Sequence, residues 1–525
     1  MRPLRHAPFR RCFRSKPLIC RDYSVRVPQA ASSAIATVSD LLSSNLHDDE
    51  GVKVEVDGWV RNIRKSSAVR FVDVSDGSCS TPLQAIVKKE LAKERSMQFG
   101  AAVRLKGTWK SRDPPNAVES NQQADGPVNT SDGHHTEVVG APELQVDEVE
   151  ILGHSKAARK YATPESLRSI PHLRMRTPLN SAMLRLRSNT MGILSQFFSE
   201  QKFQQTHPPI ITTSDCEGAG ETFRVEAGTK KDPFSKREQY LTVSSQLHLE
   251  AFAQALGNVW TLSPTFRAER SDTSRHLSEF YMLEAELSFV EDMDEILDFI
   301  QKMLSTLVQD LSQRSAWKEL DAFRTHPREP TERQSMADLD SRDILERRWN
   351  GLLTPDKWPR ITYTEAIEIL KGKTGEFEFA PEWGKSLQSE HERYLAEVIG
   401  FDKTRNAYVP VFITHYPQAI KAFYMRQAAE NPPQGAVFDC FDLIVPDLGE
   451  LAGGSMREHR YDALVANLLG REAPGLDWYM DLRRWGCPPH GGFGIGFDRV
   501  LSYLTGVKSI RDIVAFPRLY GHTQC

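Results

Sequence analysis

Hydrophobic and polar residues alternate between residues 53 and 155 in the way that is typical of short β-strands. Five segments in this range alternate or are rich in β-branched residues, and turn-forming residues such as those of SDGS separate them. They read VKVEVDGWVRNI, AVRFVDVSD, TPLQAIVKK, AAVRLKGTWKS and LQVDEVEILG. Five short strands of this kind predict a small closed β-barrel of the OB type. The polar stretch 111–135 contains Pro and Gly but almost no apolar residues, so we expect a loop there.

Beyond a basic linker with several prolines, at residues 156–177, the hydrophobic period becomes that of α-helices. Four apolar residues recur at helical spacing in SAMLRLRSNTMGILSQFFSEQKF, namely Leu184, Met191, Leu194 and Phe198. They predict an amphipathic helix, and residues 288–312 predict a second one. Residues 313–358 are charged and irregular, so we expect a surface insertion there. The chain therefore reads as an α+β protein, with a barrel domain followed by a larger domain over residues 178–525.

Composition places the chain among ordinary globular proteins. Of its 525 residues, 40% are hydrophobic and 26% are charged, and this length allows about two to four domains. No run of 18 or more apolar residues occurs, so we expect no transmembrane helix and no membrane partner. The seven cysteines are scattered and include no CxxC pair, which argues against a disulfide framework and against a structural zinc site.

The amino terminus differs in charge from the rest of the chain. Residues 1–30 contain eight Arg or Lys residues and a single acid, Asp22, whereas the net charge of the whole chain is −4. An Arg-rich segment with few acids is typical of a mitochondrial transit peptide. This pattern favours residues 1–30 as a targeting segment and the mitochondrial matrix as the location. The alternative is a basic arm that touches RNA.

The segment FRAERSDTSRHLSEF, residues 266–280, concentrates charged side chains between two apolar, strand-forming segments. An Arg such as Arg267 can hold two phosphate oxygens through parallel hydrogen bonds, and a nearby carboxylate can orient the guanidinium group. Phe280, at the end of the segment, offers a flat face to a nucleobase. The pattern predicts a site for a phosphorylated ligand, and a solvated hairpin loop is the alternative.

Two further clusters combine acids, glycines and arginine. In FDLIVPDLGELAGGSMRE, residues 441–458, Asp442 and Glu450 bracket a turn, and their oxygens could hold Mg²⁺ together with substrate phosphates. In PPHGGFGIGFDRVLSYL, residues 488–504, a Gly-rich strand leads into a helix that carries Arg499. This segment has neither the GK[ST] of a P-loop nor the GxGxxG fingerprint. Each cluster alone is generic.

Taken together and in order, the three clusters resemble the signature motifs of class II aminoacyl-tRNA synthetases, and within that class those of asparaginyl enzymes of the mitochondrial type. FRAERSDTSRHLSEF is similar to the second motif and GGFGIGFDRV to the third. The helix and strand that end in HPPI are similar to the first, with Pro209 at its proline. CEGAGETFRV, LQSEHERYL, IKAFYMR and GELAGGSMRE also match, so the resemblance spans about residues 53–525. It implies a catalytic domain over residues 178–525, with an antiparallel sheet flanked by helices, and a homodimer.

The resemblance also implies the reaction, which is ATP-dependent ligation of asparagine to tRNA(Asn) through an asparaginyl-adenylate, with Mg²⁺, for mitochondrial translation. No protein nucleophile is required, because the carboxylate of the amino acid attacks the α-phosphate. The implied ATP-binding residues are Arg267, Glu269, Arg275, His276, Phe280 and Arg499. The implied metal-binding acids are Asp442 and Glu450, and the implied catalytic residues are Arg267, Glu450 and Arg499.

By the family's pattern, Arg267 holds the α-phosphate with Glu269 nearby, and His276 lies toward the outer phosphates. Phe280 stacks under adenine, and Arg499 covers its other face.

The implied amino-acid pocket favours asparagine over aspartate. Gln246 matches a substrate-binding glutamine that both enzymes share, and three residues later the aspartyl enzymes have a Lys that meets the substrate carboxylate. Leu249 occupies that position here, which suits a neutral amide because a buried carboxylate without a partner is costly. Glu284 is expected to accept from the amide NH₂, and Arg457 to donate to the amide oxygen. Glu217 matches the residue that holds the α-amino group.

The sequence leaves three alternatives open. An aspartyl-tRNA synthetase is one, because PPHGG also occurs in some aspartyl enzymes and Arg270 departs from the asparaginyl FRAEN. A non-catalytic, synthetase-like paralogue that binds RNA is another, although the presence of Arg267, Glu450 and Arg499 together speaks against it. An ammonia-dependent asparagine synthetase, the third, shares the catalytic fold but would not need the barrel.

The barrel at residues 53–155 is expected to read the anticodon. Single-stranded bases are recognised by stacking on aromatic rings and by hydrogen bonds to their edges. Arg64, Phe71 and Gln84 match the family's base-contacting positions. Phe71 could equally belong to the core, because alternation in VRFVDV assigns its face only relative to its neighbours.

Overall fold

The computed structural model describes residues 36–44, 51–91, 97–110, 142–155, 167–213, 222–226, 238–270, 273, 276–325, 339–373, 375–468, 475–521, 523 and 525. The expected transit peptide, the 111–135 loop and the first half of the linker, 156–166, lie outside these residues, as do Glu217 and Arg275. The chain divides into two compact units, residues 1–76 with 83–155 and residues 77–82 with 156–525.

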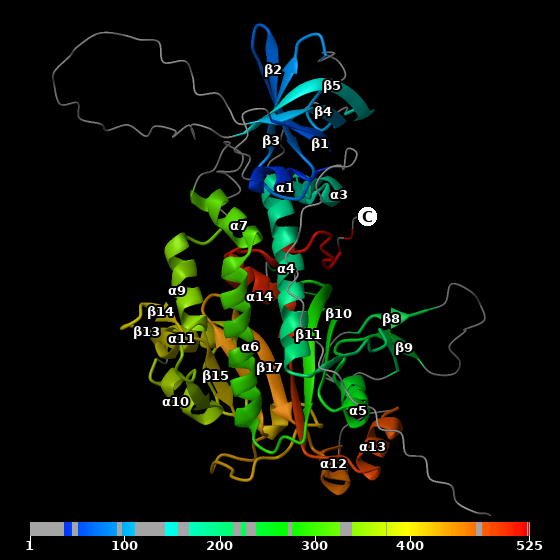
Figure 1. The fold of residues 1–525 in the computed structure, drawn as a ribbon. Helices are drawn as coiled ribbons and strands as arrows, with labels where there is room; N and C mark the ends of the chain where they lie inside the picture. Colours follow the sequence, from blue (N-terminus) through cyan, green and yellow to red (C-terminus); the bar gives the residue numbers. More distant parts are fainter. Residues whose placement is uncertain are drawn as a thin grey trace, which may run out of the picture. The chain divides into compact units, whose positions relative to one another are not determined.

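The first unit is a closed barrel of five strands (Figure 1). Its strands are β1 (Val52–Lys65), β2 (Val69–Ser75), β3 (Leu83–Lys88), β4 (Ala102–Lys110) and β5 (Glu143–Gly153), and a short helix, α1 (Val38–Ser43), precedes them. The barrel closes in the order β1-β2-β3-β5-β4, in which the β3–β5 pair is parallel and the other pairs are antiparallel. The predicted OB-type barrel is confirmed, and its strands lie where the alternation placed them.

The alternation along β2 separates the inside of the barrel from its outside. Val72 and Val74 are fully buried in the interior, whereas Phe71 and Asp73 are only partly buried. Successive side chains of a strand point to opposite faces, so Phe71 lies on the outer face with Asp73. The alternative that placed Phe71 in the core is therefore wrong.

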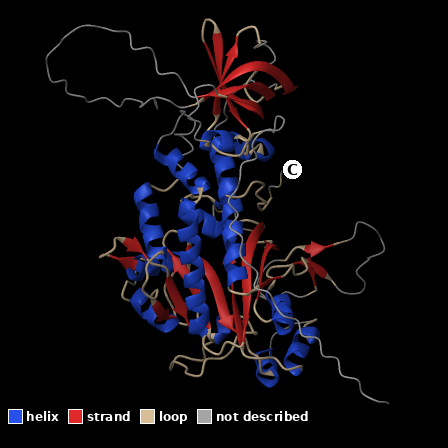
Figure 2. Cartoon of the chain, viewed as in Figure 1, coloured by secondary structure: helices blue, strands red, loops and turns tan. Residues whose placement is uncertain are grey.

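The second unit is built on an eight-stranded sheet with the order β12-β15-β16-β17-β18-β11-β10-β6 (Figures 1 and 2). In that order the strands are Arg360–Thr362, Val411–Thr414, Cys440–Val445, Gly449–Met456, His490–Gly496, Glu279–Ser288, Val259–Phe266 and Gln204–Gln205. The six strands from β15 to β10 pair antiparallel, and β12 and β6 join the two edges in parallel. The antiparallel sheet that the resemblance implied is confirmed.

Helices pack on both faces of the sheet around strand β16, whose alternate side chains belong to two different hydrophobic clusters. In β16, Phe441 and Leu443 belong to one hydrophobic cluster, and Cys440 and Ile444 to another. The first cluster also contains apolar residues of α4 (Pro178–Glu200), α6 (Met293–Gln313) and α14 (Phe497–Thr505). The second contains apolar residues of α10 (Tyr363–Lys371) and α11 (Ser389–Gly400).

The two predicted helices are present, but the buried face of the first differs from the expected one. In α4, Leu194 and Phe198 are buried as predicted, whereas Leu184 is only partly buried and Met191 is 40% exposed. The core face instead runs through further residues of α4, namely Met183, Leu186, Ile193 and Phe197. Apolar residues occur on more than one side of this helix, and each set fits the helical period. Spacing alone therefore did not show which set is buried.

The expectation of an irregular surface insertion at 313–358 is wrong for the described part of that range. It contains two helices, α7 (Ser315–Thr325) and α9 (Arg342–Leu352), and Trp349 lies in the core. Arg348 is only 2% exposed, and its burial is tolerated because it pairs with Asp340 and Asp447 at 2.7 Å each. The charged composition suggested a solvated segment. The segment instead forms a helix, α9, whose buried Arg348 is neutralised by two acids outside the helix.

The remaining elements are short and connect these layers. They are α3 (Pro171–Arg174), β7 (Ile211–Thr212), β8 (Arg224–Val225), β9 (Gln239–Leu241), α5 (Gln246–Leu256), β13 (Phe401–Asp402), β14 (Ala407–Tyr408), the 3₁₀ helix η1 (Gln418–Ile420), α12 (Tyr461–Leu468), α13 (Asp477–Arg484) and the 3₁₀ helix η2 (Ile510–Asp512). Among the described helices, none combines the length and the apolar character that crossing a bilayer requires.

Candidate active site

Alternation along two central strands gives the large sheet a polar face. The core face of β11 carries Leu283, Ala285 and Leu287. Its opposite face carries Met282, Glu284 and Glu286, which line a cavity. In the neighbouring strand β18, Phe493 and Ile495 belong to the core, and glycines alternate with them. A strand has a side-chain period of two, so this sequence pattern builds an apolar face and an open, charged face.

The polar face is hollowed into two cavities of about 140 Å³ and about 200 Å³. Residues that line both are Arg267, Met282, Glu450 and Gly494. The cavities therefore adjoin. A guanidinium group and a carboxylate lie at the junction, where a group bound in one cavity would meet a group bound in the other.

The smaller cavity contains the described residues that the resemblance implied for asparagine, which are Gln246, Glu284 and Arg457. Leu249 also lines it and is buried, so an apolar side chain stands where the aspartyl enzymes have a Lys. Gln246 begins helix α5, and its Nε2 donates to Oε1 of Glu250 at 3.1 Å. Three segments far apart in the sequence thus meet at this cavity.

Glu284 is a buried carboxylate whose position is determined by the start of α5. The hydroxyl of Ser244 donates to its Oε1 at 2.5 Å, and the backbone N–H of Ser245 donates to both of its oxygens at 2.9 and 3.0 Å. Burial raises the pKa of Glu284, while these hydrogen bonds and the charge of Arg267 act in the opposite direction. Glu284 is therefore held as an acceptor at the wall of the cavity.

Arg457 is held just as firmly, on the strand pair β17 and β18. Its Nε and Nη2 bind the carboxylate of Glu286 at 3.1 and 3.0 Å, and its Nη1 donates to Oγ of Ser455 at 2.8 Å. Gly492 makes room for this pair, since a Cβ there would lie 2.0 Å from Oε2 of Glu286. Burial alone would lower the pKa of Arg457, but the carboxylates of Glu286 and Glu250 outweigh burial and raise it. A guanidinium group has five N–H groups, so two remain for acceptors in the cavity.

The larger cavity is lined by the described residues that the resemblance implied for ATP. They are Arg267, Glu269, His276, Phe280 and Arg499. Cζ of Arg267 lies 5.6 Å from the centre of the Phe280 ring, so a cation and an aromatic face stand side by side. Nε2 of His276 lies 3.6 Å from a carboxylate oxygen of Glu269, and its Nδ1 lies 2.6 Å from the hydroxyl of Thr273.

Arg499 enters the larger cavity from the first turn of α14. Its Nη1 donates to the carbonyl oxygen of Glu450 at 2.9 Å, which ties this helix to strand β17. The neighbouring Asp498 is buried, accepts from the backbone N–H of Tyr281 at 3.0 Å and pairs with Arg187 of α4. The second and third motifs and the helix of the first are therefore joined at this point.

Asp442 and Glu450, the expected metal-binding acids, approach each other over a glycine. A Cβ on Gly453 would lie 3.2 Å from Oδ1 of Asp442 and 3.3 Å from Oε1 of Glu450. Nζ of Lys421 binds both oxygens of Asp442 at 3.0 and 2.8 Å, and it lies 4.0 Å from the ring centre of Tyr416. Asp442 therefore already has a cation as a partner.

A third carboxylate, that of Glu392 on α11, adjoins these two acids. Its Oε2 accepts from the backbone N–H of Glu450 at 3.1 Å. Burial, together with the charges of Glu450 and Asp442, raises the pKa of Glu392 to about 7. The cluster thus contains more negative charge than its neighbours neutralise, which suits the binding of a divalent cation.

Sequence reasoning did not identify Glu286, Lys421 and Glu392 as residues of this site. Lys421 and Glu392 stand in IKAFYMR and LQSEHERYL, two segments whose resemblance to the family was visible. That resemblance was the available signal, because neither residue shows its buried partner through local spacing. Glu286 follows Glu284 by two positions on a strand, so it shares its face.

The barrel carries the three residues that were expected to contact the anticodon, and they contact one another. Nη2 of Arg64 donates to Oε1 of Gln84 at 2.6 Å, and Cζ of Arg64 lies 5.7 Å from the centre of the Phe71 ring. They come from β1, β2 and β3. Together they form an aromatic and polar patch on the outer face of the barrel.

Comparison with known proteins agrees with the motifs. The family model described as "tRNA synthetases class II (D, K and N)" matches residues 164–520. The chain is 37% identical over 491 residues to the mitochondrial asparagine–tRNA ligase of Schizosaccharomyces pombe, which covers 90% of this chain and 96% of that protein. It is 38% identical over 481 residues to the asparagine–tRNA ligase of Desulfotalea psychrophila, with 90% and 96% covered.

Solved structures share the fold. Asparaginyl-tRNA synthetase from Pyrococcus horikoshii, complexed with asparaginyl-adenylate, has a TM-score of 0.72 and 28% identity, and the match covers 92% of this chain and 98% of that one. A putative aspartyl-tRNA synthetase from Leishmania major has a TM-score of 0.70 at 22% identity, over 95% of this chain and 96% of that one. With the family model matching well over half of its length, the chain belongs to the class II tRNA synthetases of the D, K and N group.

Proposed function

We propose that the chain is an asparagine–tRNA ligase that activates asparagine with ATP and transfers it to tRNA(Asn). The observation that carries this proposal is the lining of the smaller cavity, where the acceptor Glu284 and the donor Arg457 stand beside the apolar Leu249. An amide offers one acceptor oxygen and two donor hydrogens, which these two side chains complement. The names of the relatives support the same amino acid.

Aspartate fits this cavity less well for an electrostatic reason. Its side chain would place a second carboxylate near Glu284 without a Lys at position 249 to neutralise it. Like charges in a buried site repel strongly, so the site disfavours the wrong substrate as well as binding the right one.

The reaction follows from two adjoining cavities with Arg267 between them. With asparagine in the smaller cavity and ATP in the larger one, the α-carboxylate oxygen of asparagine attacks the α-phosphorus. The bond from that phosphorus to the bridging oxygen breaks, and pyrophosphate leaves. Arg267 binds the negative charge that develops at the α-phosphate, and Phe280 and Arg499 hold the base between them. A hydroxyl of the terminal tRNA ribose then attacks the activated carbonyl carbon, and AMP leaves. Catalysis therefore rests on positioning and on charge neutralisation.

Mg²⁺ would be held by Glu450 and Asp442, whose oxygens converge over Gly453. Glu392 lies beside them, and its pKa is raised by burial and, in addition, by the negative charges of Glu450 and Asp442. When bound, the ion would neutralise phosphate charge as pyrophosphate leaves. Asp442 would share its oxygens between the ion and Lys421.

The cellular setting and the assembly are part of the proposal. Mitochondrial asparagine–tRNA ligases of two yeasts are among the relatives, and the basic segment 1–30 resembles a transit peptide, which together support the mitochondrial matrix. A homodimer is expected from the resemblance to the first motif. The barrel patch around Phe71 is expected to bind the anticodon.

The proposal is tested by ATP–pyrophosphate exchange, run separately with asparagine and with aspartate. The expected result is exchange with asparagine alone. Replacing Glu284→Gln should keep the fold but lower the ratio of kcat/KM for asparagine to that for aspartate by at least about tenfold, or about 1.4 kcal/mol. Exchange with aspartate alone would contradict the proposal. An unchanged ratio in the variant would contradict the role of Glu284.

A further inference from the structure

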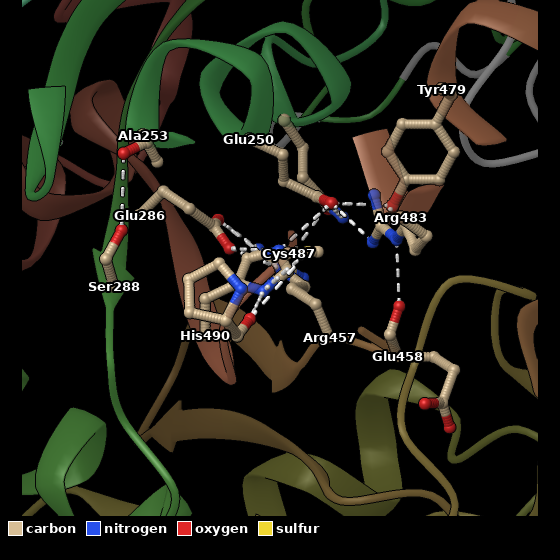
Figure 3. A network of polar contacts seen from close by, with 12 residues as sticks. Glu250, Ala253, Glu286, Ser288, Arg457, Glu458, Tyr479, Arg483, Cys487 and His490 are labelled. Carbon is tan, nitrogen blue, oxygen red and sulfur yellow. Dashed lines mark hydrogen bonds and ion pairs between the residues drawn. The ribbon is translucent and has the colours of Figure 1, made fainter. Parts of the chain in front are cut away.

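A buried network of charged and polar side chains adjoins the smaller cavity, which two of its members, Glu286 and Arg457, line (Figure 3). Its members are Glu250, Glu286, Arg457, Tyr479, Arg483 and His490. They come from α5, β11, α13, β18 and the residue after β17, so the network joins most elements around the cavity. Groups of this kind are costly to bury unless each has a partner.

Glu250 is the centre of this network. Its carboxylate accepts from Nη2 of Arg483 at 2.7 Å, from the hydroxyl of Tyr479 at 2.8 and 2.9 Å, and from Nε2 of His490 at 3.3 Å. It is 0% exposed. The charge of Arg483 and the neighbouring cations outweigh burial and hold the pKa of Glu250 below its usual value.

The same carboxylate touches two residues of the proposed asparagine pocket. It accepts from Nε2 of Gln246 at 3.1 Å, and Nε of Arg457 lies 3.8 Å away. Arg457 is in turn held by Glu286, at 3.0 Å from Nη2. One buried group therefore lies behind both Gln246 and Arg457.

His490 adds a third cation to Arg457 and Arg483. Its Nε2 faces the carboxylate of Glu250 at 3.3 Å, and its Nδ1 faces the carbonyl oxygen of Pro488 at 2.9 Å. Both ring nitrogens thus face acceptors, which only the imidazolium form can satisfy. Burial acts against the charged form, but the hydrogen bond to Cys487 and the interactions with Glu250 outweigh it and raise the pKa of His490 to about 10.

A metal ion is not needed to explain this cluster. The ligand atoms of Glu250, Glu286 and His490 lie within 4.8 Å of one another. Arg457 and Arg483 already neutralise the two carboxylates at 3.0 and 2.7 Å, however, and a cationic imidazolium is not a ligand. We therefore assign the cluster to ion pairing.

We propose that Glu250 is a specificity-determining positioning residue. Its buried carboxylate orients Gln246 and Arg457. Its negative charge balances the cations Arg457, Arg483 and His490 next to it, so that the pocket prefers a neutral amide to a carboxylate. Without this charge, Arg457 and His490 keep Glu286 as a partner, at 3.0 and 3.9 Å, whereas Arg483 loses the carboxylate with which it pairs. The surplus positive charge attracts an anionic side chain, which is what aspartate offers. This inference rests on the proposed function, because it concerns the same pocket.

The test compares full-length wild-type protein with Glu250→Gln, which keeps the size of the side chain and removes its charge. ATP–pyrophosphate exchange gives KM and kcat for asparagine, aspartate and ATP. We expect the KM for asparagine to rise about tenfold and the asparagine-to-aspartate ratio of kcat/KM to fall at least about tenfold, or about 1.4 kcal/mol. The KM for ATP should stay within about twofold, because neither Gln246 nor Arg457, the pocket residues that Glu250 contacts, lines the ATP cavity.

Tyr479→Phe is the matched control, and it also tests the inference if Glu250→Gln does not fold. It removes one donor to Glu250 and no charge. We therefore expect the KM for asparagine to rise by about threefold, while the asparagine-to-aspartate ratio of kcat/KM stays unchanged. A folded Glu250→Gln with an unchanged ratio would overturn the inference and leave the proposed function intact. If that variant does not fold, an unchanged KM for asparagine in Tyr479→Phe would overturn it. Wild-type protein that activates aspartate instead would overturn the proposed function itself.

Discussion

Arg267 lines both cavities of the site, so its substitution tests whether they act as one. Arg267→Ala should reduce ATP–pyrophosphate exchange by about 100- to 1000-fold, because a preorganised donor to the developing charge is lost. Arg267→Lys keeps the charge but not the two parallel donors, and it should recover only part of that loss. Near-normal exchange by the Ala variant would remove Arg267 from this role.

At the scale of single residues, the sequence predicted those side chains that stand inside recognisable motifs. Glu284 and Arg457 were assigned through the resemblance, and the structure brings them to one cavity. Glu250, by contrast, was not identified, because its importance comes from Arg483 and His490, more than two hundred positions away. A buried charge is tolerated only through its partners, and sequence spacing does not reveal partners at such distance.

At the scale of elements, helix α11 adjoins the proposed metal-binding acids, Asp442 and Glu450, through Glu392. The pKa of Glu392 is about 7 in the folded protein, whereas its ordinary value is 4.5. Between these pH values the folded state therefore binds more protons than the unfolded state. The contribution of Glu392 to the free energy of unfolding therefore falls as pH rises from about 4.5 to about 7 and is constant above. Glu392→Gln removes this loss, so without metal the variant should be more stable than wild type at pH 8, by on the order of 2–3 kcal/mol, with a smaller gain at pH 5.

Chemical denaturation in the presence of a chelator measures this difference. Glu390→Gln, on the same helix, is the control. Hydrogen bonds from the backbone N–H groups of Phe379 and Glu378 lower the pKa of Glu390, so its contribution changes below about pH 4.5 and its substitution should act equally at pH 5 and 8. If Glu392→Gln changed the free energy of unfolding equally at the two pH values, the pKa of Glu392 would not be raised in the folded protein.

The elements themselves were predictable in proportion to how clearly their period appears. The barrel strands alternate with a period of two and were placed correctly. Helix α4 was predicted, but Met191 was assigned to the wrong stripe because two apolar stripes adjoin. Helix α9 was missed because Arg348 and its charged neighbours are typical of a solvent-exposed segment. Arg348 is in fact buried, and two ion pairs neutralise its charge.

At the scale of the whole molecule, the strand order of the large sheet had no signal in hydrophobic periodicity. Strands β11 and β18 are neighbours, although about two hundred residues separate them along the chain. Family resemblance implied an antiparallel sheet flanked by helices, but it did not specify this strand order. The two units also divide the work in the proposed function, with amino-acid activation in the second unit and anticodon binding in the first.

This division predicts separable effects. Phe71→Ala should raise the KM for tRNA(Asn) by roughly five- to a hundredfold, because stacking of a base on an aromatic ring is worth about 1–3 kcal/mol. ATP–pyrophosphate exchange should be unchanged. Trp59→Ala, an exposed aromatic of the same barrel outside the patch, should alter neither. An unchanged KM for tRNA in Phe71→Ala would refute the stacking role.

The most direct measurement is aminoacylation of tRNA(Asn) and tRNA(Asp) transcripts by the purified full chain, each with radiolabelled asparagine and with radiolabelled aspartate. The proposed function predicts one productive combination, asparagine on tRNA(Asn). Aspartate on either tRNA, with no charging by asparagine, would contradict the assignment of the pocket. Failure of all four combinations, in a protein that binds tRNA, would show instead a synthetase fold that binds RNA without catalysis.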